Sequence, residues 1–558
     1  MSKDEMTKKP QEEKILESFS ERLAADLLKK TSKDAFLERA KQQVYRNSTD
    51  KDEQKIIGLV NTLVKTSRRQ VSGVRFLDVG TVQHIGNGVA TVSGLPNVSM
   101  DEIVVFPTGV EGMALNLEKK RVDLIMLGSE MGIRGGDLVK ATGAQLRVPV
   151  GSQLLGRITD PLGNPLDSDE PIEPSELRFF SRMAPSVIDR SPVNQSLMTG
   201  TKTIDALFPI GRGQRELIIG DRQTGKTTLA VDAILSQKNT NVRCIYVAIG
   251  QKKSSTLAVI ETIREHGAFS NTSVIISGPD DQPALRYLAP YTGMTMAEYF
   301  LDQGLDVLIV FDDLSKHANA YRELSLLLRR PPGREAYPGD IFYIHSRLLE
   351  RACRLNPENG GGSITALPIA ITQSGNISAY IPTNLISITD GQIVLDSDLF
   401  NQGQKPAIDI GRSVSRVGGA AQRPAMRKLV GNLKLELSQY QEVEHFTRFG
   451  TEVDASTRKQ IEKGQRILSI FKQKPNRPYP FSITILVLYA LNKGAMEQIP
   501  LWQISEYEQE LIDYVKSHQN KLLSDIDKVG QLTDVIIEEL DQVLNNFNQK
   551  FLSEGDIL

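Results

Sequence analysis

The strongest constraint on the fold is an eight-residue stretch, residues 220–227, which reads G-D-R-Q-T-G-K-T. It fits the pattern G-x-x-x-x-G-K-[ST], in which backbone N–H groups cradle phosphates, the lysine reaches the terminal phosphates and the hydroxyl meets Mg²⁺. An apolar run at 217–219 precedes it, and apolar residues at helical spacing follow it over 228–235. A strand, a phosphate loop and a helix in that order predict a nucleotide-binding α/β domain. A glycine-rich turn that binds nothing is the alternative.

Length and composition indicate the number of domains and the broad class of the protein. A chain of 558 residues exceeds one ordinary core, so we expect several domains. Hydrophobic residues make up 40% and charged residues 24%, as in soluble globular proteins, and the net charge of -2 gives no sign of bulk affinity for nucleic acid. Cys244 and Cys353 lack metal-ligand spacing, which favours buried free thiols in a reducing compartment. No apolar run approaches the ~18 residues of a membrane span, and no secretory leader is evident.

The first region, residues 1–73, is rich in charge yet carries apolar residues at helical spacing, such as Ile15, Phe19 and Leu23. Stripes of this kind need a surface to cover. We therefore expect short amphipathic helices that form a docking arm for another subunit. A partly disordered, solvated tail is the alternative.

Three further regions follow. Residues 74–149 contain short β-rich pieces broken by glycine, at 78–82, 88–92, 102–106 and 124–127, which predict a small closed barrel with a structural role. Over residues 150–424 apolar strands alternate with helical segments, which predicts a mostly parallel sheet covered by helices. Residues 425–558 lose the strand signal and continue in helical stripes. The expected fold is thus an N-terminal β-barrel, a central α/β P-loop domain and a C-terminal α-helical domain.

A second motif of the central domain is the buried strand at 307–311 that ends in Asp312 and Asp313. A carboxylate at the end of such a strand is the Walker B arrangement, which lies beside the Mg²⁺ held by a phosphate loop. We expect Asp312 to be an outer-shell ligand of Mg²⁺ and Thr227 to supply its hydroxyl to the same ion. A solvated aspartate at a strand end is the alternative, and the role of Asp313 stays open.

Over residues 75–475 the chain resembles the alpha subunits of F-type rotary ATP synthases. The resemblance rests on several blocks read together, which are G-D-R-Q-T-G-K-T at 220–227, Y-V-A-I-G-Q-K at 246–252, Y-L-A-P-Y-T-G at 287–293, D-D-L-S-K at 312–316, L-L-L-R-R-P-P-G-R-E-A-Y-P-G-D at 326–340, S-R-L-L-E-R at 346–351, A-Y-I-P-T-N-L-I-S-I-T-D-G-Q at 379–392 and S-V-S-R-V-G at 413–418. It implies a RecA-like central domain and a ring in which alpha-type subunits alternate with catalytic beta-type subunits around a gamma-type rotor. Residues 334–340 resemble the loop that surrounds this rotor.

The same resemblance implies a site that binds nucleotide without turning it over. Where catalytic relatives place a glutamate to orient the attacking water, this chain has Gln251, whose neutral amide cannot accept a proton as a carboxylate does. Arg416 matches the arginine that the family inserts into the neighbouring beta site, where a guanidinium stabilises the charge of the transition state. A polar loop residue and a surface-paired arginine are the respective alternatives. Removing Arg416 should abolish turnover by the ring while leaving binding to this chain intact.

The resemblance also implies the residues that contact ATP or ADP. They are Gly220, Arg222, Gln223, Thr224, Gly225, Lys226 and Thr227 around the phosphates, Gln251, and Phe400, Lys405, Pro406 and Gln473 at the adenine end. Two positions depart from the family. Lys405 stands where arginine is usual, and residues 474–476 replace the second glutamine expected after Gln473. A lysine is a point charge rather than a planar fork, so the selectivity for the base is an open question.

These features predict a non-catalytic alpha-type subunit of a rotary ATPase that couples ATP synthesis or hydrolysis to rotation and ion movement. We expect it at the cytoplasmic face of the cell membrane, in contact with the membrane only indirectly, with a peripheral subunit bound at residues 1–73 and no nucleic-acid partner. One alternative is an F-type-like ATPase adapted to drive motility or secretion, since the N-terminal arm is long. Another is a homohexameric export ATPase or nucleic-acid translocase, which would need a glutamate at position 251.

Overall fold

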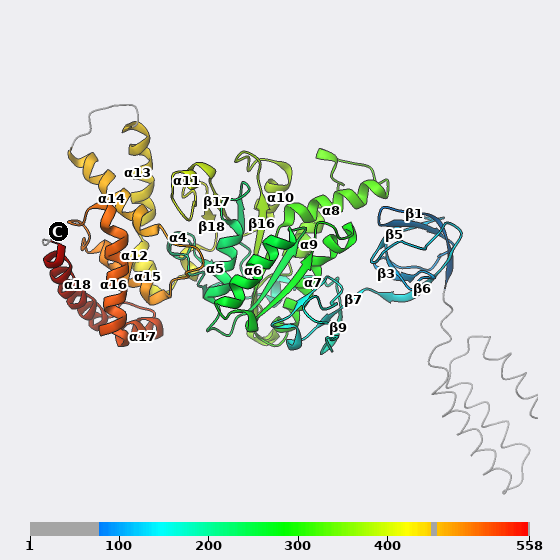
Figure 1. Ribbon diagram of the computed structural model, residues 1–558, viewed down its shortest axis with the longest axis horizontal. Coiled ribbons are helices and arrows are strands. Elements are labelled where there is room, and N and C mark those ends of the chain that lie inside the picture. The colour runs from blue at the N-terminus through cyan, green and yellow to red at the C-terminus, as the bar shows by residue number, and fades with distance from the viewer. Residues whose placement is uncertain (1–77, 448–454, 556–558) are drawn as a thin grey trace, which may run out of the picture. The chain divides into compact units, whose positions relative to one another are not determined.

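The computed structural model describes residues 78–447 and 455–555 of the chain. The predicted docking arm, residues 1–73, lies outside the described residues, and so do its apolar stripes. The domain limits 1–73, 74–149, 150–424 and 425–558 stay predictions. Within the described residues, the order of a β-barrel, an α/β domain and a helical domain confirms the expected fold class (Figure 1).

The barrel is a closed ring of strands in the order β1-β2-β5-β4-β3-β6. Its strands are β1 (Val79–Gly86), β2 (Val89–Ser93), β3 (Glu102–Val105), β4 (Glu111–Leu117), β5 (Val122–Met126) and β6 (Leu138–Gln145). Alternate side chains point inward, and Val92, Val104 and Leu124 are fully buried in the interior. Closure leaves no free strand edge, which is how a small β-module of this kind protects its backbone.

The central sheet has the order β18-β17-β12-β16-β15-β13-β14-β8, and its neighbouring strands are parallel except for β17 and β18. Its strands are β8 (Ile158–Thr159), β12 (Leu217–Gly220), β13 (Arg243–Ile249), β14 (Thr272–Ser277), β15 (Asp306–Asp312), β16 (Ser363–Ile371), β17 (Gly391–Leu395) and β18 (Val414–Ser415). Two small sheets accompany it, β7 (Arg147–Val150) with β9 (Glu176–Phe179) and β10 (Ser196–Leu197) with β11 (Ile210–Gly211).

Helices cover both faces of this sheet, as a buried parallel sheet requires. They are α4 (Lys202–Leu207), α5 (Lys226–Ser236), α6 (Lys253–Glu265), α7 (Pro283–Leu301), α8 (Leu314–Leu327), α9 (Ile341–Leu349), α10 (Tyr380–Ile388) and α11 (Ser397–Asn401). Ile218 of β12 belongs to the same buried cluster as side chains of α5 and α6, whereas its neighbours Leu217 and Ile219 belong to the cluster that includes side chains of α7 and α8. Strands β12 and β15 both run parallel to β16. Their carboxyl ends therefore lie at the same edge of the sheet, which is where parallel α/β sheets bind ligands.

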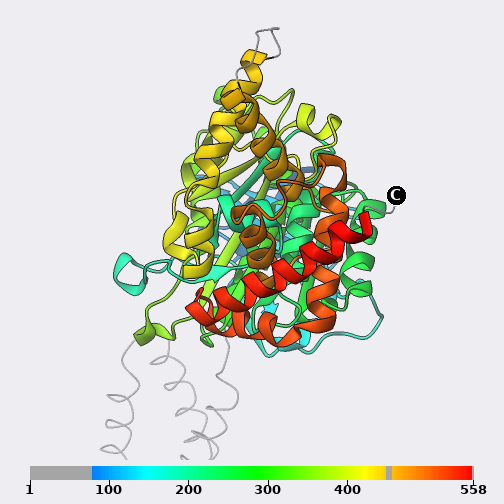
Figure 2. The same ribbon diagram turned by 90° about the vertical axis from the view of Figure 1, so that its left-hand side faces the viewer.

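The C-terminal domain is helical throughout the described residues and is seen end-on in yellow to red in Figure 2. Its helices are α12 (Pro424–Val430), α13 (Leu433–Thr447), α14 (Ala455–Phe471), α15 (Phe481–Asn492), α16 (Ile504–His518), α17 (Asn520–Val529) and α18 (Asp534–Gly555). Helix α15 is apolar on all sides and is buried over residues 481–491, so it forms the centre of the domain. A buried ion pair between Lys202 and Glu508 joins α4 to α16.

Candidate functional site

The phosphate loop lies between β12, which ends at Gly220, and α5, which begins at Lys226. A Cβ atom on Gly220 would lie 2.6 Å from the backbone oxygen of Leu395, so only glycine fits beside β17 here. Gly225 precedes the helix with a φ of 98°, a left-handed conformation that favours glycine. The loop thus directs the N–H groups at the start of α5 toward a common point, which is an anion-binding arrangement.

Two charged side chains stabilise the loop. The carboxylate of Asp221 accepts hydrogen bonds from Thr372 Oγ1 at 2.6 Å and from the N–H of Gly375 at 2.9 Å. Burial opposes them, but these bonds hold the pKa of Asp221 below its ordinary value. Lys226 is 7% exposed and its ammonium donates to the backbone carbonyl of Asp221. Burial lowers the pKa of Lys226 to about 8, although the carboxylates of Asp313 and Asp312 oppose this shift.

Asp312 ends β15 directly beside the loop. Its carboxylate accepts three hydrogen bonds, from Thr227 Oγ1 at 2.7 Å, from the Tyr246 hydroxyl at 2.8 Å and from Gln251 Nε2 at 2.6 Å. The structure therefore brings together Thr227 and Asp312, the two side chains that the sequence predicts for Mg²⁺. Tyr246 is an additional member of this cluster. Its position in the Y-V-A-I-G-Q-K block, which also contains Gln251, is the signal that could have indicated it.

Gln251 uses both ends of its side-chain amide. Its nitrogen also approaches Asp313 Oδ2 at 3.3 Å, and its oxygen accepts a hydrogen bond from Lys316 Nζ at 2.8 Å. Asp313 is fully buried and caps α8 by accepting the backbone N–H of Lys316. Burial raises the pKa of Asp313 to about 7, and the neighbouring Asp312 acts in the same direction. The cluster thus consists of two adjacent carboxyl groups joined to a lysine through a neutral amide.

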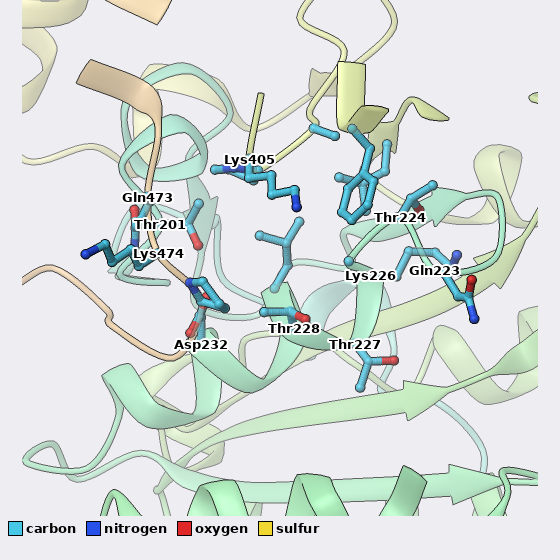
Figure 3. A pocket seen from close by; sticks show the side chains of 17 residues that line it. Thr201, Gln223, Thr224, Lys226, Thr227, Thr228, Asp232, Lys405, Gln473 and Lys474 are labelled. Carbon is cyan, nitrogen blue, oxygen red and sulfur yellow. The ribbon is translucent and has the colours of Figure 1, made fainter. Parts of the chain in front are cut away.

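A pocket of ≈ 400 Å³ extends from the loop toward the C-terminal domain (Figure 3). This volume lies within the range of small-molecule sites. Among the predicted nucleotide contacts, those that line it are Gln223, Thr224, Gly225, Lys226, Thr227, Phe400, Lys405, Pro406 and Gln473. Segments that are far apart in the chain therefore meet in one cavity, with the loop at one end and Gln473 at the other.

Three predicted contacts lie outside this lining. They are Gly220, Arg222 and Gln251. Arg222 is exposed, and Gln251 lies beside the carboxylates instead. The lining residues that the sequence did not indicate are Thr201, Thr228, Leu229, Asp232, Leu395 and Ala407, whereas Lys474 and Pro475 belong to the segment that departs from the family. Thr228 and Asp232 are four residues apart on α5, so extending the helical face beyond the loop could have found them.

At the far end of the pocket, Lys405 and Gln473 have different partners. The ammonium of Lys405 lies 4.4 Å from the centre of the Phe400 ring, a cation–π contact. The side-chain amide of Gln473 donates to the carbonyls of Gly200 at 2.8 Å and Arg477 at 2.9 Å, and accepts the N–H of Lys202 at 3.0 Å. Gln473 therefore joins the surrounding loops to one another.

Arg416 follows the short edge strand β18 and does not line the pocket. Its backbone N–H donates to Asp390, while its exposed guanidinium makes one long hydrogen bond, 3.3 Å, to the carbonyl of Ile386. Within residues 78–447 and 455–555 we find no ion pair of this guanidinium. The guanidinium also acts on the buried carboxyl group of Glu216, whose pKa burial raises and the charge of Arg416 lowers.

Three further observations concern the cysteines, metal sites and membrane spans. Cys244 and Cys353 are buried and free, as expected. The described part of the chain contains no cluster of three or more His, Cys, Asp or Glu side chains placed to hold a metal ion. None of the helices that the structure describes combines the length and the apolar character needed to cross a membrane.

Comparisons with known proteins agree with this architecture. Models of the ATP synthase alpha/beta family match its beta-barrel domain to residues 78–143, its nucleotide-binding domain to residues 200–415 and its C-terminal domain to residues 422–547. The ATP synthase subunit alpha of Aquifex aeolicus (strain VF5) is 51% identical over 475 residues, which cover 85% of this chain and 94% of that protein. The ATP synthase subunit alpha of Staphylococcus aureus (strain JH9) is 53% identical over 474 residues, with the same coverage. The chain therefore belongs to the ATP synthase alpha/beta family, among its alpha subunits.

Proposed function

We propose that this alpha subunit binds Mg-ATP or Mg-ADP in its own pocket without turning it over, and that its chemical contribution is made in the site of a beta-type neighbour. The observation that carries the proposal is the state of Gln251. Its amide nitrogen donates to Asp312 and its oxygen accepts from Lys316, and a neutral amide held in this way is not basic enough to take a proton from water as a carboxylate would.

The residues present fit a magnesium ion bound together with phosphates. Mg²⁺ is usually held by one or two protein oxygens and by the substrate phosphates, and it keeps several waters. Thr227 would offer its hydroxyl directly. Asp312 already accepts three hydrogen bonds, which suits a carboxylate that acts through a water molecule. The ion would neutralise the charge of the terminal phosphates. Lys226 and the N–H groups at the start of α5 would orient those phosphates.

Arg416 is the residue that we assign to the neighbouring site. It lies next to an edge strand, its guanidinium is exposed, and the hydrogen bond that it makes to Ile386 is long at 3.3 Å. A guanidinium can form paired hydrogen bonds to phosphate oxygens, and it stays charged at every accessible pH. Inserted in trans beside a γ-phosphate, such an arginine typically accelerates phosphoryl transfer by about 10³ to 10⁵.

The assembly that follows is a ring of alternating alpha-type and beta-type subunits around a gamma-type rotor, coupled to ion translocation. The loop over residues 334–340 would face the rotor; Arg334–Ala336 forms an exposed turn there. A peripheral subunit would bind residues 1–73. The ring would lie at the cytoplasmic face of the cell membrane without entering it. Support for these partners comes from the relatives, which are named as subunits of an ATP synthase.

The fate of bound nucleotide tests the proposal. The purified full-length chain is loaded with Mg-ATP, freed of excess nucleotide, and its bound nucleotide is extracted over time. We expect the bound ATP to remain ATP over many turnover times of the assembled ring. Lys226→Ala should retain no nucleotide, which ties retention to the phosphate loop. Conversion of bound ATP to ADP at the rate of the assembled ring would contradict the proposal.

A further inference from the structure

Two buried polar atoms in the wall of the nucleotide pocket have no hydrogen-bond partner within the described chain. They are Thr201 Oγ1 and Asp232 Oδ1, on side chains from residues that are 1% and 3% exposed. Both residues line the pocket and are labelled in Figure 3. Buried polar groups in folded proteins are nearly always paired. Both oxygen atoms are closed to solvent, so a ligand in this cavity would pair with them once the two side chains turn toward it.

Their position identifies the part of the ligand that they would meet. Asp232 follows Lys226 by six residues on α5, which places it about 9 Å farther along the helix. It shares a helix face with Thr228, which also lines the pocket. In Figure 3, Thr201 and Asp232 lie on the side of Gln473 and Lys474, opposite the loop residues Gln223 and Thr227. A nucleotide whose phosphates occupy the loop would present its base to this end.

The other polar side chains at this end are donors or are already hydrogen-bonded to the backbone. Both N–H groups of the Gln473 amide donate to backbone carbonyls, and its oxygen accepts a backbone N–H. Lys405 and Lys474 carry donors only. The second glutamine expected in this segment is absent, since Lys474 and Pro475 follow Gln473.

We propose that Asp232, assisted by the hydroxyl of Thr201, reads the hydrogen-bonding edge of the nucleobase and sets the preference of this site for adenine over guanine. The inference rests on the proposed nucleotide site and deepens it. A neutral carboxyl group offers one donor and one acceptor, which matches the ring nitrogen and amino group of adenine. An ionised carboxylate offers acceptors only, which matches the two adjacent N–H donors of guanine.

The state of the carboxyl group follows from its surroundings. Burial raises the pKa of Asp232 to about 7, while the N–H of Asn476 and the imidazole of His266 lower it. Lys405 and Lys474 are the cations that line the same pocket from other segments, and Lys226 lies on the same helix. Asp232 is thus neutral below this pH and ionised above it. The preference for adenine should decline as the pH rises through 7.

The test compares the dissociation constants of Mg-ATP and Mg-GTP for the full-length chain at pH 6 and pH 8.5. The ratio of the two constants removes the titration of the phosphates, which both nucleotides share. For the wild-type chain we expect the preference for ATP to fall by about tenfold between these pH values. Asp232→Asn keeps one donor and one acceptor at every pH, so it should retain the preference for ATP without the pH dependence. Asp232→Leu should bind both nucleotides equally, and Thr201→Val should weaken the preference several-fold.

Each outcome has a definite meaning. An unchanged pH dependence in Asp232→Asn, or an unchanged preference for ATP in folded Asp232→Leu, would overturn the assignment of Asp232. Equal binding of ATP and GTP by the wild-type chain at pH 6 would also overturn it, and would leave the nucleotide site itself intact. Nucleotide binding that survives Lys226→Ala would instead contradict the proposed site.

Discussion

Replacing Gln251 with glutamate is the substitution that would appear to restore a catalytic base, and the structure predicts that it fails. The new carboxylate would lie where the amide nitrogen now stands, 2.6 Å from Asp312 Oδ1 and 3.3 Å from Asp313 Oδ2. Two like charges about 3 Å apart repel by roughly 5 kcal/mol at an effective dielectric constant of about 20. The two hydrogen bonds that the amide donates would also be lost.

Protonation of the new glutamate limits the free energy lost to this repulsion. A glutamate with an ordinary pKa of about 4.3 can be neutralised at pH 7.5 for about 4 kcal/mol, and at pH 5.5 for about 1.6 kcal/mol. The pKa of the glutamate would be raised in the folded state, so the stability is present at low pH and is lost as the pH rises. Without Mg²⁺ and nucleotide, we expect Gln251→Glu to lose at most about 4 kcal/mol of unfolding free energy at pH 7.5 and less than half of that at pH 5.5.

Urea unfolding at the two pH values, followed by circular dichroism, measures the difference. The matched control is Gln404→Glu, because the amide of Gln404 donates to the backbone carbonyl of Leu468 rather than to a carboxylate. The control should show little dependence on pH. If Gln251→Glu is as stable as the wild-type chain at pH 7.5, or is destabilised equally at both pH values, the reasoning about the two carboxylates is wrong.

Two further substitutions test the loop and the link to the helical domain. Gly220→Ala should weaken Mg-ATP binding at least about tenfold, because the new Cβ would lie 2.6 Å from the oxygen of Leu395; Gly339→Ala, with open space around it, should have no effect on a titration with the nucleotide. Lys202→Met should cost about 3–5 kcal/mol in urea unfolding, since it leaves Glu508 buried without its cation. The double variant Lys202→Met with Glu508→Leu should recover most of that loss, and equal losses in the two variants would refute the explanation.

The sequence predicts the parts of the fold that rest on local patterns. The strand before the phosphate loop and the helix after it are confirmed as β12 and α5. Strands β4 and β6 are harder to read, because β4 carries a mixed run of polar and apolar residues and β6 is interrupted by Gly143. Their pairing depends on closure of the barrel, which is a long-range property.

The pocket likewise combines residues that a local motif predicts with residues that only long-range packing brings together. The loop residues follow from a local motif, whereas Phe400, Lys405, Pro406 and Gln473 are expected only through the family resemblance. Thr201 and Asp232 carry no motif of their own. They reach the pocket because α4, α5 and the segment after α14 pack together there, and an unpaired buried hydroxyl or carboxyl group can be recognised only once its neighbours are known.

The most direct test of the account is ATP turnover by rings assembled from a beta-type partner and either the wild-type chain or its Arg416→Ala variant. Nucleotide binding to the chain alone is measured in parallel. The account predicts that the variant binds Mg-ATP in its own pocket with unchanged affinity, assembles into rings, and loses multi-site turnover by at least about 10³. Equal turnover by variant and wild-type rings would contradict it.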